Sequence, residues 1–298
     1  MRILITGANG PAGRALGAQL ASSDFTVIGA DMDSTANEYY AAIEKVPAAS
    51  DPSMIGRLAE IIREHHIDVL IPTVSDELPA VAAAAGAELA GCTVMIGSPE
   101  AVSTAHDKWL TMQVLAAAGV PVPRSALPSS FENLDAAFEA LGRPLIVKPR
   151  VARGGRGVGV VGNHSDLDFS ALDDSWVLQE FASGEEFAPM VFNGNGENDL
   201  AVVVRKTELK QGVVGNAVST ERVAADEAVD VQRIALAAVR AVGLEYQADL
   251  DIRRLANGQP VVLEINARFG ANSRQAPELL STVLRASSRA LAAVGGRP

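Results

Sequence analysis

The sequence predicts an α/β protein in which a doubly wound parallel sheet is followed by a section that mixes helices with antiparallel strands. Over the first hundred residues, short buried strand patterns alternate with helical patterns, as in a parallel sheet. From about residue 100, strand patterns follow one another directly, which is typical of antiparallel pairing. The 298 residues are enough for two or three compact units.

The first section is expected to contain uninterrupted apolar strands separated by amphipathic helices, because a parallel sheet is buried on both faces. The expected strands are residues 3–6, 25–30, 69–72 and 93–96. The expected helices are residues 11–22, 55–65 and 78–89. A turn containing Gly7, Gly10 and Gly13 joins the first strand to the first helix.

The second section is expected to be richer in strands. The expected helices are residues 105–118, 134–141, 226–242 and 277–294. The expected strands are residues 145–148, 157–161, 176–180, 187–192, 201–205, 212–218, 246–253 and 260–265. The last two strands are joined by Ala256-Asn257-Gly258-Gln259, where Asn-Gly supplies the positive φ of a tight hairpin.

Composition excludes several classes of function. Hydrophobic residues make up 48% and charged residues 20%, which indicates an ordinary folded, soluble chain. A net charge of −11 disfavours nucleic acid and anionic membranes as partners, and 4% aromatics leave little for base stacking. The single Cys92 excludes an intramolecular disulfide. With no signal peptide and no apolar run of membrane-spanning length, the expected compartment is the cytoplasm.

The glycine turn has two interpretations. Thr6-Gly7-Ala8-Asn9-Gly10-Pro11-Ala12-Gly13 resembles the nucleotide fingerprint of short-chain dehydrogenases, with Asp31 placed to bind a ribose. An NAD(P)-dependent reductase using Gly7, Gly10, Gly13 and Asp31 is therefore one alternative. Those enzymes place a lysine four residues after a catalytic tyrosine, but here the residues four positions after the three tyrosines are Ile43, Glu44 and Leu250. We therefore favour a structural or substrate-facing turn.

A second glycine-rich segment carries more phosphate chemistry. Lys148 ends a buried strand and precedes Arg150-Val151-Ala152-Arg153-Gly154-Gly155-Arg156-Gly157-Val158-Gly159-Val160. Glycines and arginines together offer backbone N–H groups and positive charge, which suits a loop that covers a polyphosphate. Taken alone, a solvated basic hairpin explains this segment equally well. Further along, Gln179-Glu180-Phe181 leaves a strand where backbone can pair with an adenine edge, and an acid a few residues beyond, such as Glu186, can hold ribose hydroxyls. Taken alone, a polar turn is the better explanation of Glu185 and Glu186.

Three oxygen-bearing side chains on the final hairpin predict a metal site. Glu264 and Asn266 are two residues apart on one strand, so they share a face, and hairpin pairing can aim Asp251 at the same face. These are hard ligands suited to Mg²⁺ bound together with phosphate. Core packing is a poor explanation for two carboxylates in apolar strands, because buried charges need partners.

The order of these motifs resembles the ATP-grasp superfamily, most closely its carboxylate–amine ligase and carbamoyl-phosphate-synthase-like branch. The motifs are Lys108, Lys148 with its glycine loop, Gln179-Glu180-Phe181 with Glu186, Asp251, and Glu264-Ile265-Asn266-Ala267-Arg268. The resemblance implies a Rossmann-like pre-ATP-grasp domain (1–104), a small lobe with a glycine-rich lid (105–180) and a large lobe with the metal site (181–298). The N-terminal glycine turn would then face the substrate cleft.

The resemblance also implies a role for each matching residue. Lys108 and Lys148 would contact the ATP phosphates, and Lys148 would also reach the adenine. The implied adenine, ribose and lid residues are Gln179, Glu180, Phe181, Glu186, Gly154, Gly155 and Gly157. The implied ligands of two Mg²⁺ ions, with Mn²⁺ as a substitute, are Asp251, Glu264 and Asn266, with Glu264 bridging. Arg268 and Lys148 would act on the transferred phosphoryl group.

The implied reaction is an ATP-dependent ligation. A carboxylate is activated as an acylphosphate and then attacked by an amine or, less often, a thiol, with release of ADP and phosphate. The expected partners are therefore small-molecule carboxylates and amines, and a homodimer is compatible with the sequence. Many relatives carry a further C-terminal domain, so a non-catalytic ATP-binding subunit is a second alternative.

Overall fold

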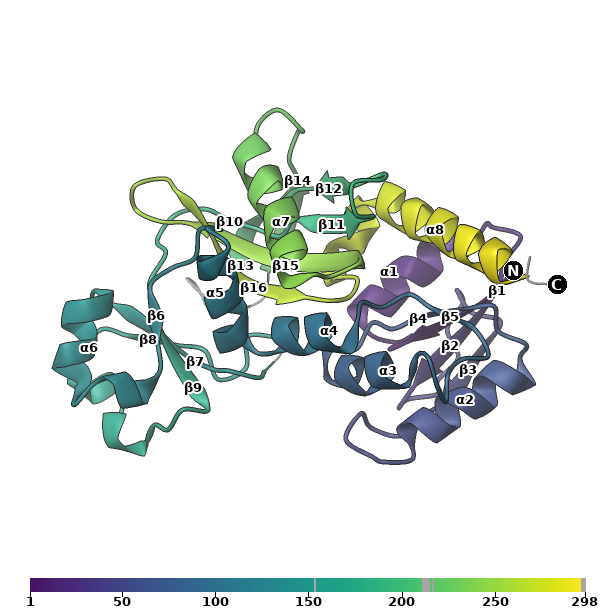
Figure 1. The fold of residues 1–298 in the computed structure, drawn as a ribbon, viewed down its shortest axis with the longest axis horizontal. Coiled ribbons are helices and arrows are strands. Elements are labelled where there is room, and N and C mark those ends of the chain that lie inside the picture. The colour runs from purple at the N-terminus through teal and green to yellow at the C-terminus, as the bar shows by residue number, and fades with distance from the viewer. Residues whose placement is uncertain (153, 211–214, 216, 296–298) are drawn as a thin grey trace.

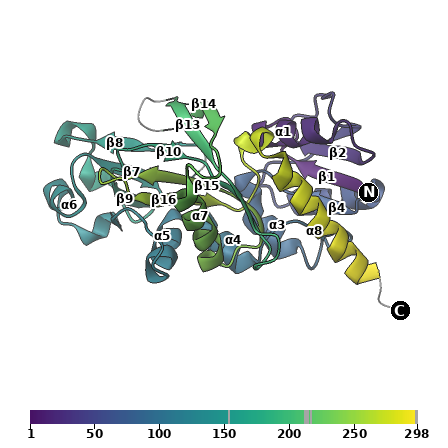
Figure 2. The same cartoon turned by 90° about the horizontal axis from the view of Figure 1, so that it is seen from above.

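The computed structural model describes residues 1–152, 154–210, 215 and 217–295. In these residues the strands form three sheets arranged along an elongated molecule (Figure 1). The N-terminal sheet and the four-stranded sheet lie at opposite ends, with the seven-stranded sheet between them (Figures 1 and 2). This arrangement leaves one junction on each side of the central sheet.

The N-terminal sheet is parallel throughout and confirms the doubly wound prediction. Its order is β3-β2-β1-β4-β5. The strands are β1 (Arg2–Thr6), β2 (Thr26–Asp31), β3 (Ala42–Lys45), β4 (Val69–Ile71) and β5 (Thr93–Val94), and the helices are α1 (Pro11–Leu20), α2 (Met54–Glu64) and α3 (Leu78–Ala84). The sequence did not predict β3, a short edge strand without a buried residue. Because β1 has β2 on one side and β4 on the other, a crevice is expected at their carboxyl ends.

The four-stranded sheet is small and has its own core. Its order is β6-β9-β7-β8, all antiparallel. The elements are β6 (Ser125–Ala126), β7 (Leu145–Pro149), β8 (Gly159–Val161), β9 (Trp176–Glu180) and α6 (Leu134–Leu141). Helix α6 buries its apolar face on this sheet, and the cluster they form is separate from the two larger cores.

The central sheet has the order β12-β11-β15-β10-β13-β14, with β16 paired to the other side of β15. The elements are β10 (Glu186–Phe187), β11 (Met190–Asn193), β12 (Leu200–Val202), β13 (Val204–Leu209), β14 (Ala217–Arg222), α7 (Val229–Val242), β15 (Tyr246–Arg254) and β16 (Pro260–Asn266). The single strand predicted at 187–192 is wrong: it divides at Pro189, which has no N–H for a ladder. Most of the strand predicted at 212–218 lies outside the described residues.

The helix predicted at 105–118 is two helices, α4 (Pro99–His106) and α5 (Lys108–Ala117). Asp107 is extended between them, and its carboxylate accepts hydrogen bonds from the N–H groups of Trp109 and Leu110. This N-cap starts α5 at Lys108. At the other end of the chain, α8 (Pro277–Gly295) returns to the N-terminal domain (Figure 2). Among the described helices, none combines the length and apolar character needed to cross a bilayer.

Candidate active site

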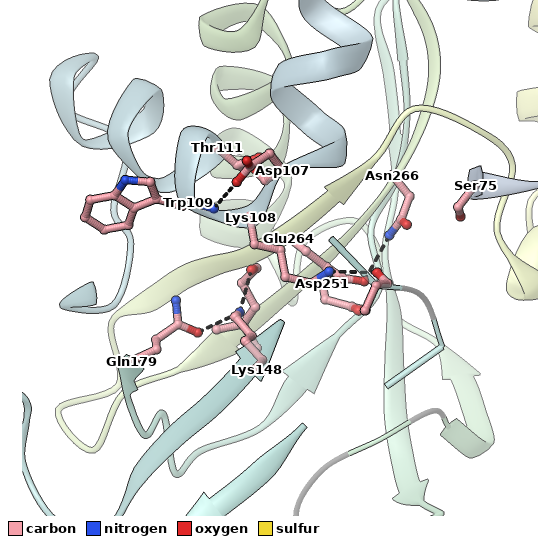
Figure 3. A network of polar contacts seen from close by, with 12 residues as sticks. Ser75, Asp107, Lys108, Trp109, Thr111, Lys148, Gln179, Asp251, Glu264 and Asn266 are labelled. Atoms are coloured by element: carbon pink, nitrogen blue, oxygen red, sulfur yellow. Dashed lines mark hydrogen bonds and ion pairs between the residues drawn. The ribbon is translucent and has the colours of Figure 1, made fainter. Parts of the chain in front are cut away.

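The β15–β16 hairpin brings four oxygen-bearing side chains onto one face. In its register Asp249 lies opposite Asn266, and Asp251 lies opposite Glu264. Side chains two apart share a face of a strand, so all four point the same way. Asn266 Nδ2 donates to Glu264 Oε1 at 3.2 Å (Figure 3). The structure thus brings together the three predicted metal ligands and adds Asp249, whose only signal was its spacing from Asp251.

Two lysines approach this face from other elements (Figure 3). Lys108 Nζ is 3.3 Å from Glu264 Oε2 and donates to the carbonyl oxygen of Ala152 at 2.8 Å. Lys148 Nζ, from β7, donates to Gln179 Oε1 at 2.8 Å and to the carbonyl oxygen of Leu263 at 3.1 Å. Both predicted lysines therefore lie at the junction of the small sheet and the central sheet.

Burial and neighbouring charges shift the pKa values of the side chains at this junction. Burial lowers the pKa of Lys148 to about 8. Burial also opposes the ionised form of Glu264, but the ammonium groups of Lys108 and Lys148 hold its pKa well below the usual range. Burial raises the pKa of Asp251. Glu264 is therefore the firmly ionised carboxylate of the pair.

Lys206 is a third lysine, which the sequence analysis missed. It lies on β13, and its Nζ is 2.6 Å from both Glu186 Oε1 and Asp251 Oδ1. Burial opposes its charge, but the two carboxylates raise its pKa. The predicted strand ended at residue 205, one position too early to place this side chain on the sheet. In this state Lys206 neutralises a predicted metal ligand and the predicted ribose acid.

A cleft between the two lobes contains the predicted nucleotide residues. It encloses about 770 Å³ of empty space, part of it open to solvent. The predicted residues that line it are Lys108, Lys148, Gly155, Gln179, Glu180, Phe181, Glu186, Asp251 and Glu264. Arg253 lies over the Phe181 ring, with its Cζ 5.3 Å from the ring centre, and its Nη1 is 3.5 Å from Glu186 Oε2. The side chain of Glu180 pairs with Arg124, and the backbone N–H of Glu180 donates to the carbonyl oxygen of Arg124 at 2.8 Å.

The glycine-rich loop borders this cleft. Gly154, Gly155 and Gly157 all have positive φ, between 64° and 73°, where residues with a Cβ are strained. A Cβ on Gly157 would also be 2.8 Å from the ring of Pro149. Arg153 lies outside the described residues. The glycines are thus required by the loop's conformation.

A second, larger hollow adjoins the first, between the N-terminal domain and the central sheet. It encloses about 1560 Å³, including open solvent, and its lining includes Gly7, Gly10, Ser75, Asp249, Arg268 and Asn272. Arg268 Nη1 is 3.1 Å from Asp249 Oδ2. Asp251, Glu264 and Asn266 line this hollow as well, so the hairpin face lies where the two spaces meet.

Comparison with known proteins identifies the family. The family model described as "ATP-grasp domain" matches residues 105–272, more than half of the chain. The chain belongs to the ATP-grasp family. A second model, described as "NAD dependent epimerase/dehydratase family", matches residues 3–98, the Rossmann-like domain that precedes the ATP-grasp fold.

Curated relatives of this ATP-grasp protein are longer than the region they share with it. The carbamoyl phosphate synthase large chain of Bifidobacterium longum is 26% identical over 267 residues, which cover 80% of this chain and 23% of that protein. The D-alanine–D-alanine ligase of Methylibium petroleiphilum is 35% identical over 191 residues, which cover 57% and 59% of the two chains. The match therefore spans less than two thirds of either relative.

Solved structures share the fold. Biotin carboxylase from Campylobacter jejuni, in complex with β-γ-ATP, aligns with a TM-score of 0.76 at 18% identity, over 96% of this chain and 70% of that one. An L-amino acid ligase from Bacillus licheniformis aligns with a TM-score of 0.69 at 19% identity, over 92% and 68%. At these identities the likeness shows the ATP-grasp architecture alone.

In the N-terminal glycine turn of the ATP-grasp protein, the backbone and the Asp31 side chain make contacts within the domain. A Cβ on Gly13 would be 2.2 Å from the carbonyl oxygen of Gly7, so close packing of α1 requires a glycine there. The Asp31 carboxylate accepts hydrogen bonds from the N–H groups of Asn9 at 2.9 Å and Asp33 at 3.0 Å. The Asp31 contacts favour the structural interpretation over a dinucleotide site, whereas close packing at the third glycine is common to both.

The hairpin face fits Mg²⁺ by its donor chemistry. Within the described ranges, no group of three or more His, Cys, Asp or Glu side chains is placed to hold a metal by itself. In nucleotide sites Mg²⁺ takes one or two carboxylates and completes its shell with phosphate and water. Asp251, Glu264 and the amide oxygen of Asn266 offer such a partial set at the junction of the cleft and the adjoining hollow.

Proposed function

We propose that this ATP-grasp protein is an ADP-forming ligase that joins a small carboxylate to an amine through an acylphosphate. The observation that carries the proposal is the convergence of Lys108, Lys148, Asp251 and Glu264 on one cleft between two lobes, with Asn266 bonded to Glu264 on the same hairpin face. The ligase names among its relatives and the structural likeness to an L-amino acid ligase support the same reaction class.

The cleft between the lobes is the proposed ATP site. Lys108 and Lys148 would bind the phosphates, under a lid formed by Gly154, Gly155 and Gly157. Gln179, Phe181 and the backbone of Glu180 would hold the adenine, and Glu186 the ribose. Because Lys206 now pairs with Glu186 and Asp251, nucleotide and metal would compete with it for both carboxylates.

Asp251, Glu264 and Asn266 are the proposed ligands of two Mg²⁺ ions, for which Mn²⁺ could substitute. When bound, Mg²⁺ neutralises charge on the phosphate oxygens. Glu264 suits the bridging position because the neighbouring lysines keep it ionised. It bonds to Asn266 and lines both the cleft and the adjoining hollow.

The hollow beside Arg268 is the proposed site of carboxylate and amine. A carboxylate oxygen of the substrate attacks the γ-phosphorus, the bond to the ADP oxygen breaks, and an acylphosphate forms. The amine nitrogen then attacks the acyl carbon, loses a proton, and phosphate leaves. Arg268, Lys148 and the loop amides would stabilise the charge on the transferred group.

Three further proposals concern the domain boundaries, the oligomeric state and the class of substrate. We divide the chain at 104/105 and 180/181, which keeps each of the three sheets within one unit. We keep the homodimer as an expectation, to be checked by light scattering. The small-molecule substrates are proposed by class only, since the matched region is part of each curated relative.

Release of ADP tests the proposal. The protein would be supplied with ATP and Mg²⁺ and with bicarbonate or single and paired amino acids, with hydroxylamine added to trap acylphosphate as hydroxamate. A ligase gives ADP release that depends on a carboxylate, and it gives hydroxamate. ADP release no higher than that of a Glu264→Gln variant, for every combination, would favour the non-catalytic ATP-binding subunit.

A further inference from the structure

We infer that Ser75, in the N-terminal domain, is a positioning residue for Arg268. The inference rests on the role proposed above for Arg268. Ser75 opens the short turn Ser75–Glu77 that follows β4, and its Oγ accepts a hydrogen bond from Arg268 Nε at 3.2 Å. The two residues are 193 positions apart, so this bond joins the N-terminal domain to the large lobe at the proposed reaction centre.

The loop that carries Ser75 is held in place by a buried network. Thr73 donates from its N–H to Thr6 Oγ1 at 2.9 Å and from its hydroxyl to the carbonyl oxygen of Thr6 at 2.7 Å. The N–H of Val74 donates to Glu77 Oε1 at 3.2 Å, and Thr6 Oγ1 also donates to that oxygen. Thr6, Thr73 and Glu77 are all buried. These bonds fix the backbone on both sides of Ser75.

Arg268 is also held from the opposite side. Its Nη1 donates to Asp249 Oδ2 and to the carbonyl oxygen of Phe269, each at 3.1 Å. A guanidinium is planar and its donors form a fixed fork, so bonds at Nε and Nη1 together determine the orientation of the plane. A guanidinium oriented in advance does not have to reorganise as charge develops on the transferred phosphoryl group.

The Ser75 contact can be separated from simple docking of the domains. Gln19 Nε2, on α1, donates to the carbonyl oxygen of Ser273 at 2.7 Å, and Gln247 Nε2 donates to that of Met95 at 2.7 Å. Apolar residues of α8 and the N-terminal sheet also share one core. Gln19→Ala therefore removes a bond between the domains without touching Arg268, and it serves as the matched control.

Titration calorimetry with two probes tests the inference without a known substrate. The first probe is ATP–Mg²⁺ and the second is ADP–Mg²⁺ with aluminium fluoride, which mimics the phosphoryl group in transfer. Ser75→Ala should weaken binding of the second probe about tenfold, the size of one hydrogen bond to a charged group. Its affinity for ATP–Mg²⁺ should stay within about twofold. Ser75→Thr should restore most of the loss, and Gln19→Ala should match wild type with both probes.

Unchanged affinity of Ser75→Ala for the second probe would overturn the inference. Equal losses with both probes in Ser75→Ala and Gln19→Ala would also overturn it, because the contact would then only dock the domains. If the wild type binds ATP–Mg²⁺ but binds ADP–Mg²⁺ no more tightly when aluminium fluoride is added, the role of Arg268 on which the inference rests is contradicted. Failure of the wild type to bind ATP–Mg²⁺ at all would instead contradict the proposed function.

Discussion

Asp251 and Glu264 lie directly opposite each other in the β15–β16 ladder, and each is paired with a lysine from a different element. Lys206 comes from β13, which is separated from β15 by β10, and Lys108 comes from the start of α5. Two like charges that face each other across strands repel unless cations neutralise them. The arrangement therefore needs positive charge on this face of the hairpin, which Lys206 and Lys108 supply.

Glu264→Gln should abolish ADP formation while the fold persists. The amide keeps the shape of the side chain but removes the charge that faces Lys108 and holds the proposed metal ions. We expect a loss of at least about a hundredfold in turnover, in line with removal of a group that stabilises transferred charge. The measurement is steady-state ADP release at saturating Mg²⁺, with circular dichroism to verify the fold. Asp199→Asn, which alters a carboxylate paired with Arg240, is the control and should retain activity.

ATP affinity should fall as the pH rises above about 8. Burial lowers the pKa of Lys148 to about 8, so this lysine loses the proton that binds phosphate within an accessible pH range. If binding requires the ammonium form, Kd should be flat at lower pH and rise by up to about tenfold per pH unit above 8. Calorimetry between pH 7 and 9.5 measures this. Lys148→Met should bind ATP more weakly and should not show the rise in Kd above pH 8. An equal rise in that variant would assign the titration to another group.

Gly13→Ala should destabilise the N-terminal domain. The new Cβ would lie 2.2 Å from the carbonyl oxygen of Gly7, so α1 would have to move off the turn. Overpacking of this kind costs about 1–3 kcal/mol. Gly56→Ala, in the first turn of α2 with nothing within 4 Å, should instead stabilise by up to about 1 kcal/mol. Thermal unfolding of both variants checks the pair, and equal stability of Gly13→Ala and wild type would refute the close packing.

The sequence was most informative where one local pattern decides the structure. Period-two spacing placed Glu264 and Asn266 on one face, and Asn257-Gly258 located the hairpin turn that aligns Asp251 with them. The parallel sheet followed from alternation of strand and helix. Two local signals were overlooked: Pro189, which lacks an N–H for the ladder, divides a strand, and Asp107, an N-cap residue, restarts a helix at Lys108.

Contacts between distant segments were not predictable from local patterns. Ser75 reaches Arg268 only because β4 ends at the same junction as the hairpin, and no spacing in the chain encodes that. Lys206 lies one position beyond the expected strand 201–205, and it is the strand order β15-β10-β13 that places it beside Glu186 and Asp251. Asp249 carried a signal, two residues before Asp251, but its pairing with Arg268 depends on the fold.

Titration calorimetry of ATP–Mg²⁺ and of NAD(P)H against wild type, Lys148→Ala and Gly10→Ala tests the central claim most directly. If ATP binds between the lobes, wild type binds ATP and Lys148→Ala loses about tenfold to a hundredfold in affinity, because a charge-assisted hydrogen bond is removed. Gly10→Ala should leave ATP affinity nearly unchanged, since Gly10 lines the other hollow. Loss of nucleotide binding in Gly10→Ala together with full binding in Lys148→Ala would contradict the ATP site and restore the dinucleotide alternative.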